Sequence, residues 1–261
     1  MGHPVRCGRT GPFDWPIIHG MREHAEQEPG EKRERRTRPL RIGVAVPMAN
    51  PTVEPELRTL LPAGIDLLVT RSVASGDSRT RLLAYFENLD ESLRSFGGMA
   101  LDAFGFACTA SSYLVEPLRE RSSCERHAEA FGFPVVTACA AIEATLRDRG
   151  ARRLAIASPY PPWIVRACDA HWTRRGFEVI TSSSAVEHMD DTRAIYDLDP
   201  RAASEHFART LSGVTADALL ITGTGLPTLE LVEPLQQRLG LPVVTSNRCL
   251  ARALLARAGG A

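Results

Sequence analysis

The sequence predicts an α/β protein of two pseudosymmetric lobes, each a mainly parallel sheet flanked by helices, with a cleft between them. Three observations support this prediction. Short apolar runs alternate with amphipathic segments of ten or more residues from Leu40 onward, a pattern typical of parallel sheets covered by helices. Two of the apolar runs end in turns rich in small and hydroxyl residues. The two halves also share segments of sequence.

The first lobe is expected to span residues 39–150. Its alternating pattern predicts strands at 41–46 and 65–70 and a third that ends before Cys108, with helices at 52–61 and 79–96. The second lobe is expected to span residues 151–261. Its pattern predicts strands at 153–157, at 177–181 and before Gly223, with helices at 163–175 and 200–211. We expect the last helix, 247–258, to pack back on the first lobe and Asn247 to cap it.

The second half repeats the first. A Val-Glu-Pro-Leu segment occurs at 115–118 and again at 232–235, and Phe-Pro-Val-Val-Thr at 133–137 is echoed by Leu-Pro-Val-Val-Thr at 241–245. We therefore interpret residues 40–150 and 151–255 as two copies of one unit. Two such copies place equivalent strand ends opposite each other across a cleft, where ligands bind in open α/β sheets.

Two turns are the candidate ligand-binding segments. The Cys-Thr-Ala-Ser-Ser run that begins at Cys108 follows the apolar stretch 101–107, and the Gly-Thr-Gly run at 223–225 follows the stretch 218–222. A strand that leads into the first turn of a helix offers free N–H groups and a positive dipole end to an anion. Cys108 and Gly223 are then expected to face each other over one ligand.

Cys108 has two interpretations. Free cysteines are often buried simply as small apolar residues. A thiol at the start of a helix among hydroxyl residues, however, has the electropositive surroundings typical of reactive cysteines. We favour the second interpretation.

The composition excludes several classes of function. Basic and acidic residues balance at 31 each, so no electrostatic feature favours nucleic acid or an anionic membrane as a partner. No apolar run approaches the roughly 18 residues that a membrane span needs, and no signal peptide is recognisable. We expect a cytoplasmic protein. Residues 1–38 are rich in charge, Pro and Gly and are expected to be disordered or an extension outside the fold.

Neither metal nor cofactor is indicated. The six cysteines are scattered without C-x-x-C pairs or nearby histidine spacing, so we expect free thiols rather than a zinc site or a disulfide framework. The chain has no G-x-G-x-x-G and no Walker-type loop, which argues against a nucleotide cofactor.

Five segments, taken together and in order, resemble a known superfamily. They are the strand end and turn at 46–56, the Cys108-Thr109 turn, the strand end at 157–160, the turn at 222–225 and the closing segment at 244–247. The chain is similar over residues 40–255 to the aspartate/glutamate racemase superfamily, in the branch of maleate cis-trans isomerases and arylmalonate decarboxylases.

The resemblance implies a cofactor-free site for small carboxylic acids, between two lobes that often each supply a cysteine. Cys108 matches the first-lobe cysteine, whereas Gly223 stands where the second would be. Two-base racemisation needs an acid/base group on each face of the substrate, so this departure argues against it. Dimers are common in the superfamily, so a homo-oligomer is a further expectation.

Three functions remain open. In the first, the thiolate of Cys108 adds to the double bond of a cis-enedioate and leaves after rotation, giving the trans product. In the second, a malonate-type acid loses carbon dioxide and Cys108 protonates the enediolate. In the third, the protein binds carboxylates with little or no turnover. We favour the isomerase, with the decarboxylase second.

The resemblance also implies substrate-binding roles. Asn50 and Tyr160 match residues that contact a carboxylate in the superfamily, although a helix cap for Asn50 and simple packing for Tyr160 are alternatives. The remaining expected contacts are neutral donors, which hold an anion without quenching a thiolate; they lie at Thr109, Ala110, Gly223, Thr224 and Gly225. Glu54 and Glu56 are expected to be first-turn helix charges.

Overall fold

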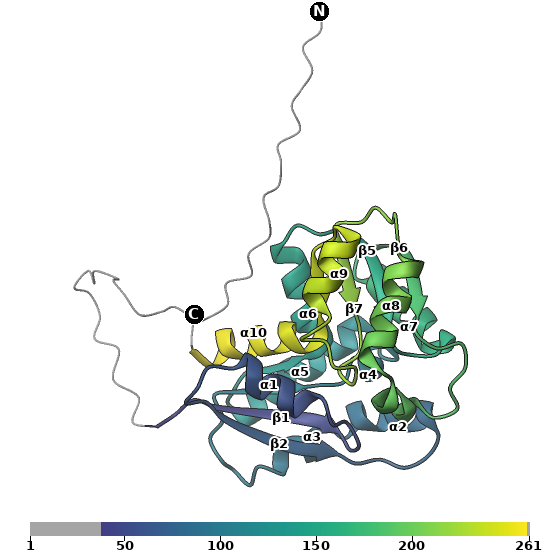
Figure 1. Ribbon diagram of the computed structural model, residues 1–261. Coiled ribbons are helices and arrows are strands. Elements are labelled where there is room, and N and C mark those ends of the chain that lie inside the picture. The colour runs from purple at the N-terminus through teal and green to yellow at the C-terminus, as the bar shows by residue number, and fades with distance from the viewer. Residues whose placement is uncertain (1–37, 260–261) are drawn as a thin grey trace, which may run out of the picture. The chain divides into compact units, whose positions relative to one another are not determined.

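The computed structural model describes residues 38–259, and residues 1–37 of the expected N-terminal extension lie outside them. Two four-stranded sheets, each flanked by helices, make up the fold (Figure 1). The two-lobed α/β fold expected from the sequence is confirmed. The boundary between residues 150 and 151 stays a prediction. In the described part of the chain, no helix is long and apolar enough to cross a bilayer.

The first sheet has the strand order β2-β1-β3-β4, and all its strands are parallel. Its strands are β1 Arg41–Pro47, β2 Asp66–Ser72, β3 Ala103–Phe106 and β4 Val135–Thr137. The two central strands, β1 and β3, are almost wholly buried, as their continuous apolar sequences require in a sheet covered on both faces.

The second sheet repeats this order as β6-β5-β7-β8, again all parallel. Its strands are β5 Arg153–Ser158, β6 Glu178–Ser184, β7 Ala218–Ile221 and β8 Val243–Thr245. The identical order is the structural counterpart of the sequence repeat. It also means that β1 and β5, and β3 and β7, are equivalent strands of the two lobes.

The helices of the first half are α1 Val53–Leu60, α2 Ser78–Glu87, α3 Leu89–Arg94, α4 Thr109–Tyr113, α5 Pro117–Phe131 and α6 Ala138–Asp148. Those of the second half are α7 Pro162–Arg174, α8 Pro200–Thr210, α9 Val232–Leu239 and α10 Ser246–Gly259, with a 3-10 helix, η1, at Thr192–Asp197. The single helix expected at 79–96 is two helices, because the backbone leaves the helical region at Asn88.

Alternate residues of β5 pack on opposite faces of the second sheet, as the two-residue period of a strand dictates. Ala155 and Ala157 pack in a cluster with Phe207 of α8 and Leu235 of α9. Leu154 and Ile156, which point to the other face, belong to the larger core that extends through both lobes. The second sheet therefore has α8 and α9 on one face and the shared core on the other.

Helix α10 lies against α6, α1 and β3. Gly105 of β3 allows this close approach, because a Cβ atom there would stand 3.1 Å from a methyl carbon of Leu254 and 3.2 Å from one of Leu250. The final helix of the chain thus packs on the first sheet.

Candidate active site

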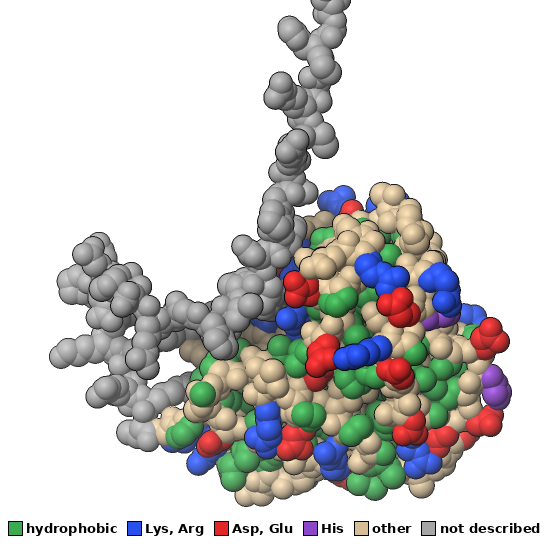
Figure 2. Space-filling view, in the orientation of Figure 1, with side chains coloured by type: hydrophobic (Ala, Val, Ile, Leu, Met, Phe, Trp, Pro, Cys, Tyr) green, Lys and Arg blue, Asp and Glu red, His purple; other side chains and the backbone are tan. Residues whose placement is uncertain are grey.

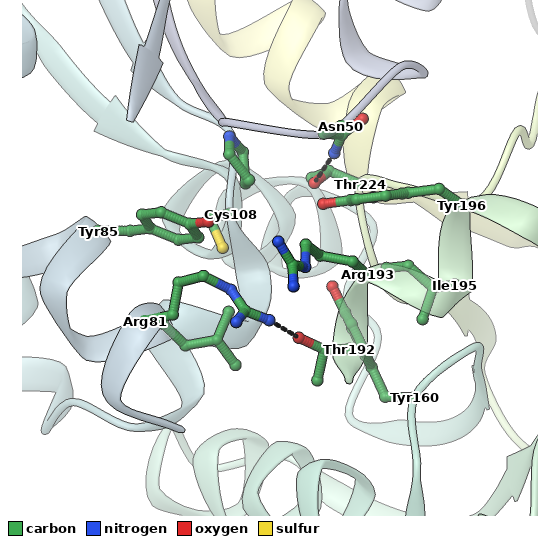
Figure 3. A pocket seen from close by; sticks show the side chains of 12 residues that line it. Asn50, Arg81, Tyr85, Cys108, Tyr160, Thr192, Arg193, Ile195, Tyr196 and Thr224 are labelled. Atoms are coloured by element: carbon green, nitrogen blue, oxygen red, sulfur yellow. Dashed lines mark hydrogen bonds between the residues drawn. The ribbon is translucent and has the colours of Figure 1, made fainter. Parts of the chain in front are cut away.

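The candidate site lies at the carboxyl ends of the central strands of both sheets. One pocket is lined by Asn50, which follows β1, by Cys108, which follows β3, by Tyr160, which follows β5, and by Thr224, which follows β7 (Figure 3). Four equivalent strand ends thus bring together four of the residues expected from the sequence. Their roles toward a substrate stay predictions.

Cys108 is the residue immediately before α4, and its side chain is buried. The hydroxyl of Ser111 donates a hydrogen bond to its sulfur at 3.0 Å. Burial raises the pKa of the Cys108 thiol, while the Ser111 hydroxyl and the N–H groups of Ser111 and Ala110 act in the opposite direction. The sulfur therefore has donors suited to a thiolate, in a site that favours the neutral thiol when no ligand is bound.

Asn50 has the local role that the sequence left open, and its contact with a substrate carboxylate stays a prediction. Its Oδ1 accepts hydrogen bonds from the backbone N–H groups of Thr52 and Val53, at 2.9 and 3.2 Å, at the start of α1. Its Nδ2 donates to the hydroxyl of Thr224 at 3.2 Å, and that hydroxyl donates to the carbonyl of Ala107 at 2.9 Å. The helix-capping amide is therefore also part of the pocket wall and fixes Thr224 beside it.

The other four expected contacts are not among the residues that line the pocket. Thr109 and Ala110 are buried in the first turn of α4. Gly223 has a φ of +89°, and a Cβ there would lie 2.9 Å from the ring of Pro159 and 3.3 Å from that of Tyr160. A Cβ at Gly225 would lie 2.6 Å from the ring of Tyr196. Contact of these four residues with a substrate stays a prediction.

Two arginines on the pocket wall were missed. Arg81 comes from α2 and is buried, and Arg193 comes from η1. Both bind the carboxylate of Asp191: Arg81 through Nη2 at 2.5 Å, and Arg193 through Nε at 2.9 Å and Nη2 at 2.5 Å. The hydrogen bonds from Arg193 lower the pKa of Asp191 to about 2. This carboxylate is therefore ionised at neutral pH and holds both guanidinium groups.

The internal repeat is the signal that could have found these arginines. Strand β2 ends at Ser72 and β6 ends at Ser184, and each arginine follows nine positions later, from 72 to 81 and from 184 to 193. Arg81 and Arg193 are thus at matching distances from equivalent strands. Two positive groups come to one pocket from corresponding places in the two lobes.

Three tyrosines complete the polar wall. Burial raises the pKa of Tyr160, of Tyr85 on α2 and of Tyr196 on η1. Each phenol therefore keeps its proton at neutral pH and can donate a hydrogen bond to an anion. Neither Tyr85 nor Tyr196 lies in a segment that was expected to bind a ligand.

A second set of contacts joins the lobes behind the pocket. Glu56 of α1 is buried and accepts hydrogen bonds from the N–H and hydroxyl of Thr228 and from Nδ2 of Asn247 at 2.7 Å. Nδ2 of Asn247 also donates to the carbonyl of Thr224 at 3.2 Å, and its Oδ1 accepts no hydrogen bond from the described residues. The capping role expected of Asn247 is therefore not seen. Glu56 is an inter-lobe acceptor as well as a first-turn residue.

A family model described as arylmalonate decarboxylase matches residues 42–260. The chain belongs to this family.

Two curated relatives are named maleate isomerase. One, from Geobacillus stearothermophilus, is 24% identical over 221 residues, covering 79% of this chain and 87% of the relative. The other, from Pseudomonas putida, is 24% identical over 239 residues, covering 84% and 92%.

Two solved structures have the same fold. Maleate cis-trans isomerase of Nocardia farcinica, in a cysteine-to-serine mutant with a covalently bound succinylcysteine intermediate, matches with a TM-score of 0.75 at 24% identity, covering 84% of this chain and 92% of that one. A liganded arylmalonate decarboxylase, in which one glycine is cysteine and one cysteine is serine, matches with a TM-score of 0.75 at 22% identity, covering 85% and 93%. The resemblance stated from the sequence is confirmed.

The pocket of this arylmalonate decarboxylase family member is small. Its volume is about 20 Å³, which is room for about one water molecule. Thr192, Arg193, Ile195 and Tyr196, all from η1, form one side of it. A larger ligand therefore requires side chains that line the pocket to rearrange. Among the described residues, no group of three or more His, Cys, Asp or Glu side chains could hold a metal ion.

Proposed function

We propose that this protein is a cofactor-independent isomerase that converts a small cis-unsaturated dicarboxylate, such as maleate, to its trans isomer through covalent addition of Cys108. One observation carries the proposal: the same pocket holds one cysteine and two arginines that come from corresponding places in the two lobes. A nucleophile supports covalent chemistry, and the two arginines, of which Asp191 compensates one charge, leave a net positive wall that supports an anionic substrate.

The proposed reaction balances without any other reactant. The thiolate of Cys108 forms a bond to one olefinic carbon, and the π electrons move into the carboxylate on the other side to give an enediolate. The central C–C bond is now single and rotates. The electrons then return, the S–C bond breaks, and the trans diacid leaves with the thiolate restored. The cycle consumes no proton.

Ser111 and the start of α4 support the thiolate in this scheme. The hydroxyl at 3.0 Å from the sulfur and the N–H groups of Ala110 and Ser111 stabilise negative charge on it. The same donors, with the hydroxyl of Tyr160, are suited to the charge that develops on the enediolate. Since burial favours the thiol, the cycle begins only after Cys108 has lost its proton to solvent, and these donors stabilise the thiolate that results.

Decarboxylation of a malonate-type acid is the second candidate, and the raised pKa of Cys108 favours it. A thiol that keeps its proton at neutral pH is suited to protonate an enediolate after carbon dioxide leaves. Pro47, Leu82 and Ile195 give the pocket an apolar part, which supports loss of a carboxylate by desolvation. The third candidate, carboxylate binding without turnover, is an outcome of the test below.

Five described cysteines are free thiols. They support the cytoplasm, a reducing compartment, as the place where the protein acts.

The test compares wild-type protein with the Cys108→Ala variant on maleate and on phenylmalonate, followed by proton NMR. We expect fumarate from wild type and none from Cys108→Ala. Cys124→Ala is the matched control, because Cys124 is a free thiol outside the pocket, and it should act like wild type. Formation of phenylacetate from phenylmalonate, with no fumarate from maleate, would support the decarboxylase. Binding of both acids without product would support the binder, and wild-type turnover by Cys108→Ala would rule out a covalent role.

A further inference from the structure

The two arginines of the pocket differ in how many donors they have left. In Arg81, Nη1 donates to the carbonyl of Gly76 at 3.0 Å, and Nη2 donates to Asp191 and to the hydroxyl of Thr192. Its side chain is 4% exposed, and both of its terminal nitrogens already donate to protein groups. Arg81 therefore acts mainly as a fixed positive charge on the pocket wall.

Arg193 has one terminal nitrogen, Nη1, that is not used in hydrogen bonds to described residues. Its Nε and Nη2 both bind Oδ2 of Asp191, and its backbone N–H binds Oδ1 at 2.9 Å. Its Nη1 donates no hydrogen bond to any described residue. Figure 3 shows the guanidinium extending into the space between Cys108 and Tyr160. One edge of this planar group is thus fixed by Asp191, and Nη1 remains available to a ligand.

Resting on the proposed function, we propose that Arg193 is the specificity-determining residue for the second carboxylate of the substrate, the one remote from the carbon that Cys108 attacks. Asp191 is its positioning residue, because it binds Nε and Nη2 of Arg193 and so orients Nη1 toward the pocket. The substrate class is then the dianionic cis-dicarboxylates, and the corresponding half-amides and monocarboxylates are excluded.

The charges of the cluster agree with this assignment. Arg81 and Arg193 carry two positive charges and Asp191 one negative charge, which leaves one positive charge on this wall. A carboxylate compensates that charge and offers two acceptor oxygens, whereas a carboxamide brings no charge and offers one acceptor oxygen beside NH₂ donors that a guanidinium cannot accept. A charge-assisted hydrogen bond contributes enough to discriminate between the two by about 10- to 100-fold.

The test measures kcat/KM for maleate and for its monoamide, maleamate, with wild type, Arg193→Gln, Arg193→Lys and the control Arg201→Gln, which changes an exposed arginine on α8. We expect wild type to prefer maleate by about 10- to 100-fold. Arg193→Gln should lose that factor on maleate and change by less than about threefold on maleamate, and Arg193→Lys should keep part of the preference because it keeps the charge. Arg201→Gln should match wild type.

An equal loss on both compounds in Arg193→Gln, or no loss on either, would overturn the assignment. A second measurement separates it from the proposed reaction: calorimetric titration with succinate and with its monoamide, which have no double bond to react. If wild type turns nothing over but binds succinate more tightly, and Arg193→Gln removes that difference, the assignment stands and the isomerase proposal falls. If wild type binds the two equally, the assignment is wrong.

Discussion

The hydroxyl of Thr224 lies 2.9 Å from the carbonyl oxygen of Ala107, so the turn after β7 is bonded to the residue that precedes the candidate nucleophile. The same hydroxyl accepts a hydrogen bond from Asn50. One side chain of the second lobe therefore joins two strand ends of the first. Since no side chain projects from Gly223 toward Cys108, Thr224 is the second-lobe residue of this turn that completes the pocket.

Replacement of Thr224 by Val tests this link. Valine keeps the shape but removes the hydroxyl, which leaves the Ala107 carbonyl and Nδ2 of Asn50 without this partner. We expect a loss of about 1 to 3 kcal/mol in the free energy of unfolding, measured by urea denaturation, together with lower turnover. The control is Thr59→Val, on the exposed face of α1, which should change neither quantity. Unchanged stability in Thr224→Val would argue against the link.

The reactivity of Cys108 is expected to depend on pH in a defined direction. Burial raises its pKa, so in the folded protein the thiol stays protonated to higher pH than in the unfolded chain, where the pKa is about 8.5. The corresponding stability is present below that value and is lost as pH rises through the folded pKa. Iodoacetamide should therefore label Cys108 more slowly than a free thiol near pH 7, and faster as pH increases.

Ser111→Ala sharpens this prediction. The variant removes the donor that lies 3.0 Å from the sulfur, so the pKa of Cys108 should rise further and labelling at a given pH should slow. Ser122→Ala, an exposed serine of α5, is the control. Peptide mass spectrometry of the labelled site gives the rates. A faster reaction in Ser111→Ala would show that the hydroxyl does not stabilise the thiolate.

Arg175 is expected to be the main ionic support between the lobes. It follows α7, forms ion pairs with Glu120 of α5 and Glu143 of α6, and donates to His171 at 2.8 Å. Arg175→Ala leaves two carboxylates without this partner, one of them, Glu120, fully buried, and should lower the free energy of unfolding by about 3 to 5 kcal/mol. The neighbouring Arg174→Ala breaks a more exposed pair at 3.6 Å and should cost at most about 1 kcal/mol. Equal losses would contradict the difference in burial.

Gly223 is required by both its backbone and its surroundings. Its positive φ of +89° disfavours any side chain, and a Cβ would press on Pro159 and Tyr160. Gly132, with a φ of +76° and no atom within 4 Å of its Cβ position, has the first constraint without the second. Gly132→Ala should lose about 1 to 2 kcal/mol of stability from its positive φ alone. Gly223→Ala should lose more than Gly132→Ala and should also lose activity, through displacement of Tyr160. Equal behaviour in urea and turnover measurements would contradict this account.

The strand ends of the site could be predicted because local sequence determines them. Buried parallel strands are continuous apolar runs, so the exits at Cys108 and Thr224 can be located, and the repeat predicts that they converge. Asn50 and Tyr160 were expected from the resemblance to the superfamily. The break at Asn88 could not be predicted, because the residues on both sides of it keep a helical apolar pattern.

Arg81 and Arg193 could not be recognised from their local sequence. Each lies in a polar segment that is typical of a solvent-exposed surface, and Arg81 is buried only because Asp191 of the other half compensates its charge. Long-range pairing of this kind has no local signature. The nine-residue offset from equivalent strands was nevertheless present in the sequence, and the repeat would have revealed it.

Covalent catalysis by Cys108 is tested most directly by intact-mass and peptide mass spectrometry of wild-type protein that is quenched with acid during turnover of maleate. We expect a fraction of the chain to be heavier by one maleic acid, with the addition on the peptide that contains Cys108 and absent from Cys108→Ala. Turnover of maleate with no such adduct, or with the adduct on another cysteine, would contradict it.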